Sequence, residues 1–222
     1  MKKVFLSLGL VLAGCSGNES PPPDTEQKSE AKVDAPHISQ LPELERGCEV
    51  TTLAMLLQHA GEDVDKMILA EEIEKVPFEQ DGKRGHPAEG FVGNMETMDE
   101  PGLGVYHGPI AELAEKYLPG RVIDLTGESF GEVLKHVADG RPVWVLVPST
   151  FDVVPEEEWE TWETEQGEID ITYSWHSVLV TGFDEDHVYV NDPLDEKNAQ
   201  HPKEAFIDGW EQFGNQAITY EG

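Results

Sequence analysis

Apolar residues recur at helical spacing in five parts of the chain. The spacing predicts helices at 48–60, 65–76, 109–118, 129–138 and 203–213. In the first, Val50, Leu53 and Leu57 lie three or four residues apart and predict one apolar face, and Gly61 follows its end.

Short runs rich in β-branched residues predict strands at 121–125, 142–147, 171–183, 187–191 and 216–220. The turn at 184–186 joins two of these strands into a hairpin. Residues 78–107 follow neither periodicity and are rich in Gly, Pro and polar side chains, which predicts a long loop.

The first residues differ from the rest of the chain in composition. Lys2 and Lys3 precede the apolar run 4–12, which is too short to span a bilayer and has the form of a secretion signal. The run ends in Leu-Ala-Gly-Cys15, which resembles the lipobox of bacterial lipoproteins. That resemblance implies a signal peptide at 1–14, a lipid on Cys15 and attachment to the outer face of the cell membrane. Residues 15–35 carry prolines and charges but almost no apolar side chains, so we expect a disordered tether and a folded domain at 36–222.

The chain is strongly acidic. Its 45 acidic residues against 15 basic ones give a formal charge of −30, and loss of residues 1–14 would leave 13 basic residues and a charge of −32. Nucleic acids and anionic lipid surfaces are polyanions, so this charge argues against both as partners. We therefore expect membrane contact through the lipid on Cys15 alone, and a monomer.

Cys48 is the second of two cysteines and begins the first predicted helix, directly after Gly47. If Cys15 carries a lipid, Cys48 has no disulfide partner in its own chain. Unpaired N–H groups and the helix dipole at this position lower a thiol pKa, which favours a nucleophile. The alternative is that Cys48 is a small core residue.

The predicted hairpin brings a histidine close to a carboxylate. A turn centred near residue 185 pairs residues whose numbers sum to about 370, so His176 faces the chain within two residues of Asp192. A carboxylate beside a histidine fixes its tautomer and stabilises its charged form, as a general base requires. Cys48, His176 and Asp192 therefore form a candidate catalytic set.

Five motifs in this order resemble the family-39 cysteine peptidases, the papain-like group known from bacteriocin-processing transporters, and above all their stand-alone, exported branch. The motifs are 47–57 (GCEVTTLAMLL), 90–93 (GFVG), 104–106 (GVY), 175–182 (WHSVLVTG) and 188–193 (VYVNDP). The resemblance implies an α+β, papain-like fold with the cysteine helix packed on an antiparallel sheet. It implies that Cys48 is the nucleophile, His176 the general base, Asp192 its orienting group and Gln40 the oxyanion-stabilising residue. No cofactor or metal is expected, and the implied substrate is a peptide or protein.

Other interpretations of the same residues remain open. A transglutaminase-like acyl transferase would use the same groups, and a catalytically inactive papain-like module would bind peptides without cutting them. A zinc site from Cys48, His176 and Asp192 lacks the paired short motifs of structural zinc sites. The glutamate-rich segment 151–170 predicts an acidic surface insert, with a flap for basic peptides as the alternative.

Overall fold

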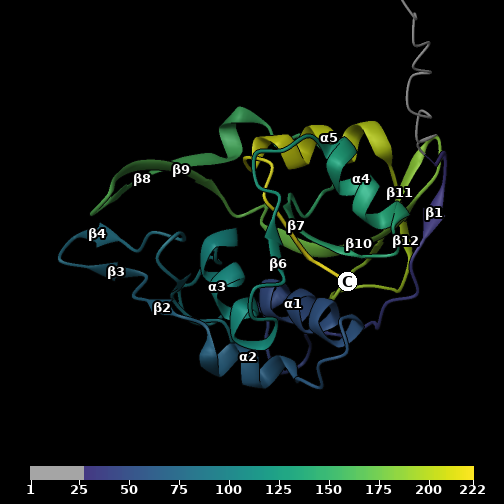
Figure 1. Ribbon diagram of the computed structural model, residues 1–222. Coiled ribbons are helices and arrows are strands. Elements are labelled where there is room, and N and C mark those ends of the chain that lie inside the picture. Colours follow the sequence, from purple (N-terminus) through teal and green to yellow (C-terminus); the bar gives the residue numbers. More distant parts are fainter. Residues whose placement is uncertain (1–27) are drawn as a thin grey trace, which may run out of the picture.

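A seven-stranded antiparallel sheet forms the centre of the computed structural model, which describes residues 28–222 (Figure 1). Six strands follow one another in the order β12-β11-β10-β7-β13-β6, and β1 also pairs with β10. Their bounds are β1 (Ala31–Lys32), β6 (Val122–Asp124), β7 (Val143–Val147), β10 (His176–Phe183), β11 (His187–Asn191), β12 (Ala199–Pro202) and β13 (Ala217–Tyr220).

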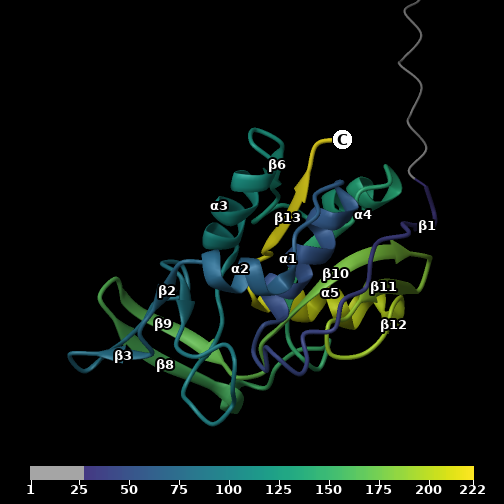
Figure 2. The same cartoon turned by 90° about the horizontal axis from the view of Figure 1, so that it is seen from below.

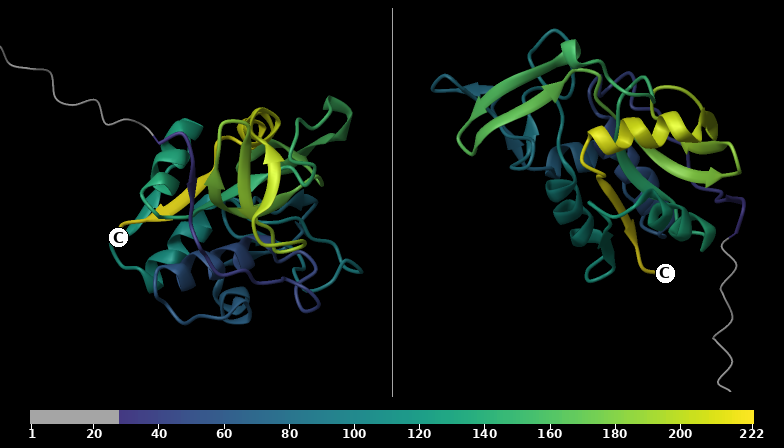
Figure 3. Two further views of the ribbon diagram at one scale, coloured as in Figure 1. Left: turned by 90° about the vertical axis from the view of Figure 1, so that its right-hand side faces the viewer. Right: turned by 90° about the horizontal axis from the view of Figure 1, so that it is seen from above.

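Helices cover both faces of this sheet. Figure 1 shows α4 (Phe130–Ala138) and α5 (Lys203–Gln212) above it, and α1 (Cys48–His59), α2 (Lys66–Glu72) and α3 (His107–Tyr117) below it. The view from below in Figure 2 has α1 and α2 in front of the sheet, and Figure 3 gives the same layers from two further sides. Helix α1 and strand β10 therefore face each other inside one α+β domain.

The residue alternation along β7 explains why both faces need helices. Val143, Val145 and Val147 belong to the core under α4 and α5, whereas Trp144 and Leu146 belong to the core with α1. Because successive strand residues point to opposite faces, a continuously apolar strand buries both. The prediction of a buried central strand at 142–147 is confirmed.

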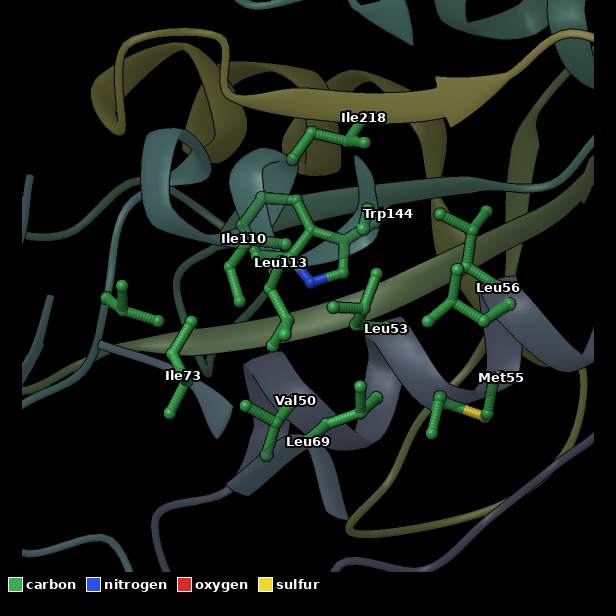
Figure 4. Packing of buried hydrophobic residues seen from close by; sticks show 14 of the residues in the cluster. Val50, Leu53, Met55, Leu56, Leu69, Ile73, Ile110, Leu113, Trp144 and Ile218 are labelled. Atoms are coloured by element: carbon green, nitrogen blue, oxygen red, sulfur yellow. The ribbon is translucent and has the colours of Figure 1, made fainter. Parts of the chain in front are cut away.

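Helix α1 is more deeply buried than its sequence predicts. Every residue from 48 to 57 is buried, not only the predicted face. Figure 4 shows Leu53 and Val50 among side chains from α2, α3 and the sheet, including Leu69, Ile110 and Trp144. A helix surrounded by partners on all sides is rigid, which favours a fixed position for its first residue.

A second sheet extends from the side of the domain (Figure 1). It joins β3 (Glu79–Gln80), β4 (Lys83–Arg84), β8 (Trp159–Thr164) and β9 (Gly167–Thr172), and the short 3₁₀ turn Glu156–Glu158 directly precedes β8. Trp162 is buried against Phe78, with 5.3 Å between ring centroids. The acidic segment thus ends in a hairpin, whose Trp162 packs on the domain edge while its glutamates face outward. This arrangement agrees with the predicted acidic surface insert.

Several predicted boundaries are wrong. The helix predicted at 65–76 ends at Glu72, because the chain turns extended at Ile73 and enters β2 (Lys75–Val76), which pairs with β5 (Phe91–Val92). The predicted loop 78–107 therefore holds short strands. The strand predicted at 171–183 is two strands, broken at 173–175, and β12 escaped prediction because its side chains are mostly polar.

The folded domain begins earlier than residue 36. Ala31 and Lys32 pair with β10, and Val33 and Ala35 are buried, so the end of the predicted tether belongs to the domain. These small apolar residues are too few to stand out in a charged segment. The predicted signal peptide, Cys15 and the earlier part of the tether lie outside the described residues.

Candidate active site

Cys48 is the first residue of α1, directly after the N-cap Gly47. A Cβ on Gly47 would lie 2.4 Å from the Cβ of Leu44, so only glycine lets the preceding turn close against the helix start. The space beside Gly47 is thus filled by the Leu44 side chain. The Cys48 side chain is buried and its Sγ donates to Glu49 Oε2 over 3.3 Å.

His176 begins β10 and Asp192 directly follows β11. The predicted pairing rule holds, because Val180 pairs with Val190 and Leu179 with Asn191. His176 Nε2 lies 2.8 Å from Asp192 Oδ1, and both side chains are less than one tenth exposed. The hairpin therefore brings this histidine and carboxylate into a buried hydrogen bond.

The surroundings of Asp192 hold its carboxyl in the ionised form. Burial alone would raise the pKa of Asp192, but the hydrogen bond and charge of His176 and the N–H of Leu194 together lower it. His37 Nε2 donates to the backbone carbonyl of Asp192 over 2.8 Å, and the ring of Phe151 stands edge-on to His176. Neither His37 nor Phe151 is among the predicted site residues.

Packing of α1 on β10 brings Cys48 beside the start of the histidine strand. Thr52 Oγ1 donates to the carbonyl of Ser177 over 3.0 Å, and the Ser177 backbone is near enough to Cys48 to affect the pKa of its thiol. Since His176 Nε2 is engaged with Asp192, Nδ1 is the ring nitrogen left to exchange a proton with a thiol. Within residues 28–222 the Cys48 sulfur donates to Glu49 and makes no hydrogen bond to His176.

The thiol pKa departs from the sequence prediction. Burial raises the pKa of Cys48 well above its ordinary value, and the charge and hydrogen bond of Glu49 raise it further. The Ser177 backbone lowers it, but less strongly. The direction is therefore opposite to the predicted lowering, because burial, and after it the neighbouring Glu49 carboxylate, raise the pKa of the Cys48 thiol.

Gln40 is buried in the loop before α1. Its Nε2 donates to the carbonyls of Leu44 and Glu45, each over 3.0 Å. These two acceptors fix the amide orientation, since a flipped amide would place Oε1 against two carbonyl oxygens. Both amide hydrogens thus hold the loop together, and the predicted oxyanion role of Gln40 stays a prediction.

Glu49 is the charged residue of this site that the sequence analysis missed. It is fully buried, and its Oε1 accepts from Trp175 Nε1 over 2.7 Å and from the Val105 N–H over 3.0 Å. One signal was available: Glu49 lies four residues before Leu53, so its carboxylate shares the predicted apolar face.

Comparisons with known proteins agree with this arrangement. Residues 32–218 match the model of the Peptidase_C39 like family. The chain belongs to this family. The uncharacterized Bacillus subtilis protein YvpB is 46% identical over 181 residues, which span 81% of the chain and 71% of YvpB.

A crystal structure from Bacillus anthracis, provisionally described as a C39-like peptidase, is 50% identical. The match covers 88% of this chain and 98% of that one, with a TM-score of 0.86. The papain-like α+β fold that the sequence implied is therefore confirmed, as is the resemblance to the C39-like peptidases.

The described part of the chain has neither a helix suited to crossing a membrane nor a cluster of metal-binding side chains. No helix in residues 28–222 combines the length and apolar composition that crossing a membrane requires. In the same residues, no cluster of three or more His, Cys, Asp or Glu side chains has a geometry suited to a metal ion.

Proposed function

We propose that the chain is a cysteine peptidase that hydrolyses peptide bonds, with Cys48 as nucleophile, His176 as general base and Asp192 as its orienting group. The observation that carries the proposal is the buried 2.8 Å hydrogen bond from His176 to Asp192, with His176 on the strand against which the cysteine helix packs. Membership of a C39-like peptidase family supports the same activity.

The reaction begins with proton transfer from Cys48 Sγ to His176 Nδ1. The thiolate attacks the peptide carbonyl carbon and forms a tetrahedral oxyanion, which the Cys48 backbone N–H and the Gln40 amide stabilise. For that role the Gln40 amide exchanges one of its loop carbonyls for the oxyanion.

Collapse of this intermediate completes the first half-reaction. The C–N bond breaks as His176 donates its proton to the leaving amine, and a thioester remains on Cys48. Water then gives a proton to His176 and attacks the thioester, which releases the carboxylic acid and restores the thiol. Asp192 fixes the ring tautomer throughout and stabilises the imidazolium.

A peptide library tests this activity. Wild-type protein should cleave some members, and Cys48→Ala should lose at least about 10³-fold in rate while it keeps the same circular dichroism spectrum. Undiminished hydrolysis in Cys48→Ala would rule out the proposed nucleophile. Adding a primary amine distinguishes hydrolysis from acyl transfer, because a transferase incorporates the amine into the product.

A catalytically inactive peptide-binding module is the second candidate function. The observation that favours it is the buried Cys48 sulfur, which donates to Glu49 and has a raised pKa. A module of this kind would bind library peptides and leave them uncut, and Cys48→Ala would bind them equally well.

We also propose that the protein acts on the outer face of the cell membrane, held by a lipid on Cys15. The support is the Leu-Ala-Gly-Cys15 sequence after a short apolar run. Mass spectrometry of the protein purified from membranes should find an N-terminal lipid-modified Cys15. Recovery of an unprocessed chain with Met1 and an unmodified Cys15 would contradict this proposal.

A further inference from the structure

The carboxyl group of Glu49 lies between the cysteine helix and the histidine strand. Its Oε1 accepts from the indole of Trp175, which immediately precedes His176, and from the Val105 N–H. Its Oε2 accepts a hydrogen bond from the Cys48 thiol. Each carboxyl oxygen therefore has a defined partner, and one partner is the proposed nucleophile.

The surrounding residues fix this carboxyl in place. Trp144 Nε1 donates to the Glu49 backbone carbonyl over 3.1 Å, and the Trp175 ring stacks on Tyr106 at 5.3 Å between centroids. A Cβ at Gly104 would lie 2.3 Å from both Glu49 Oε1 and Trp175 Nε1, so this backbone passes as close as a glycine allows. A carboxyl held this tightly is preorganised for a single hydrogen bond to sulfur.

The charges around the thiol disfavour its anion. Glu49 on α1 and Asp192 after β11 are both acidic, and each raises the pKa of Cys48, after burial as the largest cause. From β10, the Ser177 backbone lowers the pKa of Cys48 less strongly, and His176 Nε2 is already engaged with Asp192. A thiolate in this position would lie beside a second buried negative charge.

We propose that Glu49 is a positioning residue that holds the resting nucleophile as a neutral thiol by accepting the hydrogen bond of Cys48 Sγ–H. The proposal rests on the proposed function, in which Cys48 is the nucleophile. Activation is then a rotation of Sγ away from Glu49, after which its proton passes to His176 Nδ1. Glu49 stays a carboxylate, and the products of this step are a thiolate and an imidazolium.

The consequence is a peptidase whose free thiol reacts slowly. Alkylating agents and oxidants attack the thiolate far faster than the thiol. A carboxylate that retains the proton on sulfur therefore protects Cys48 until the ion pair with His176 forms. Papain-like sites that rest as a preformed ion pair react with alkylating agents without this step.

Glu49→Gln tests the proposal with almost no change in shape. The amide oxygen can still accept from Trp175 and Val105, while the NH₂ group now donates toward sulfur and favours the thiolate. We expect the iodoacetamide reaction of Cys48, followed against pH, to shift to lower pH in this variant. Alkylation at pH 7.5 should be at least about tenfold faster, the change that one pKa unit produces.

Glu71→Gln is the matched control, since it removes one negative charge from an exposed position on α2. Its alkylation profile should follow that of the wild type. Coincident profiles for wild type and Glu49→Gln would overturn the proposal. Alkylation needs no substrate, so this result is independent of whether peptides are cleaved.

A second measurement examines the wild-type protein directly and uses Cys48→Ala only as its reference. The infrared S–H stretching band of Cys48, identified by its loss in Cys48→Ala, should be present at neutral pH and shifted to low wavenumber by the carboxylate acceptor. Absence of the band would show a thiolate at rest and would equally overturn the proposal.

Discussion

Gly104 shows how closely a single position is tied to the site. Its backbone passes beside the hydrogen bond of Glu49 and Trp175, where an added methyl group would lie 2.3 Å from an atom of each. The side chains it would displace are a buried carboxyl and an indole that hydrogen-bond each other. At the residue scale, the site thus depends on a glycine that carries no chemistry of its own.

Gly104→Ala should therefore destabilise the protein by about 1–3 kcal/mol, the usual cost of overpacking. It should also speed alkylation of Cys48, because Glu49 is pushed from its place. Gly108→Ala is the control, since nothing lies within 4 Å of its Cβ and alanine favours helix α3. Urea unfolding measures both variants, and equal stability for the two would contradict the packing described.

The elements differ in how far the sequence predicts them. Helix α1 and the β10–β11 register depend on residues close in sequence, so periodicity and turn position predicted both, and with them the His176–Asp192 pair. The role of Glu49 depends on partners 56 and 126 residues away, Val105 and Trp175. No local pattern encodes those contacts, nor the burial within the folded chain that raises the pKa of Cys48.

The hairpin of β8 and β9 should be separable from the catalytic sheet. It is anchored by a small cluster apart from the two larger cores, in which Trp162 packs with Val92, Leu103 and Ile171 and which Trp175 borders. Trp162→Ala should cost about 3 kcal/mol and increase hydrogen exchange in β8 and β9. The exposed neighbour Glu163→Ala serves as control. If Trp162→Ala changed Cys48 alkylation as strongly as Glu49→Gln does, the two regions would not be separable.

At the scale of the whole molecule, the site lies where the two layers of the domain meet. Helix α1 brings the cysteine from one layer, and the central sheet brings the histidine and aspartate (Figure 1). Burying a carboxylate at this junction affects the stability of the whole fold as well as the thiol. Burial raises the pKa of Glu49 above its ordinary value, against the N–H groups that bind it.

The free energy of unfolding should depend on pH because the Glu49 carboxylate is buried in the folded protein. Below about pH 4 Glu49 is protonated in both the folded and the unfolded chain, so burial carries no charge penalty. As pH rises, the unfolded chain ionises first and the folded wild type loses stability relative to Glu49→Gln. The difference in free energy of unfolding should grow by about 1.4 kcal/mol for each unit by which the Glu49 pKa is raised. A difference that is constant from pH 4 to pH 8 would contradict this, and Glu71→Gln corrects for the general effect of lost charge.

As the proposed nucleophile, Cys48 should carry the acyl group during peptide hydrolysis. The most direct test of this role is rapid acid quenching of the enzyme with a cleaved peptide or its ester, followed by mass spectrometry of the Cys48-containing fragment. We expect the acyl mass as a thioester on Cys48 in the wild type, and none in Cys48→Ala. Full turnover by wild type without an adduct on Cys48, together with full turnover by Cys48→Ala, would contradict this role.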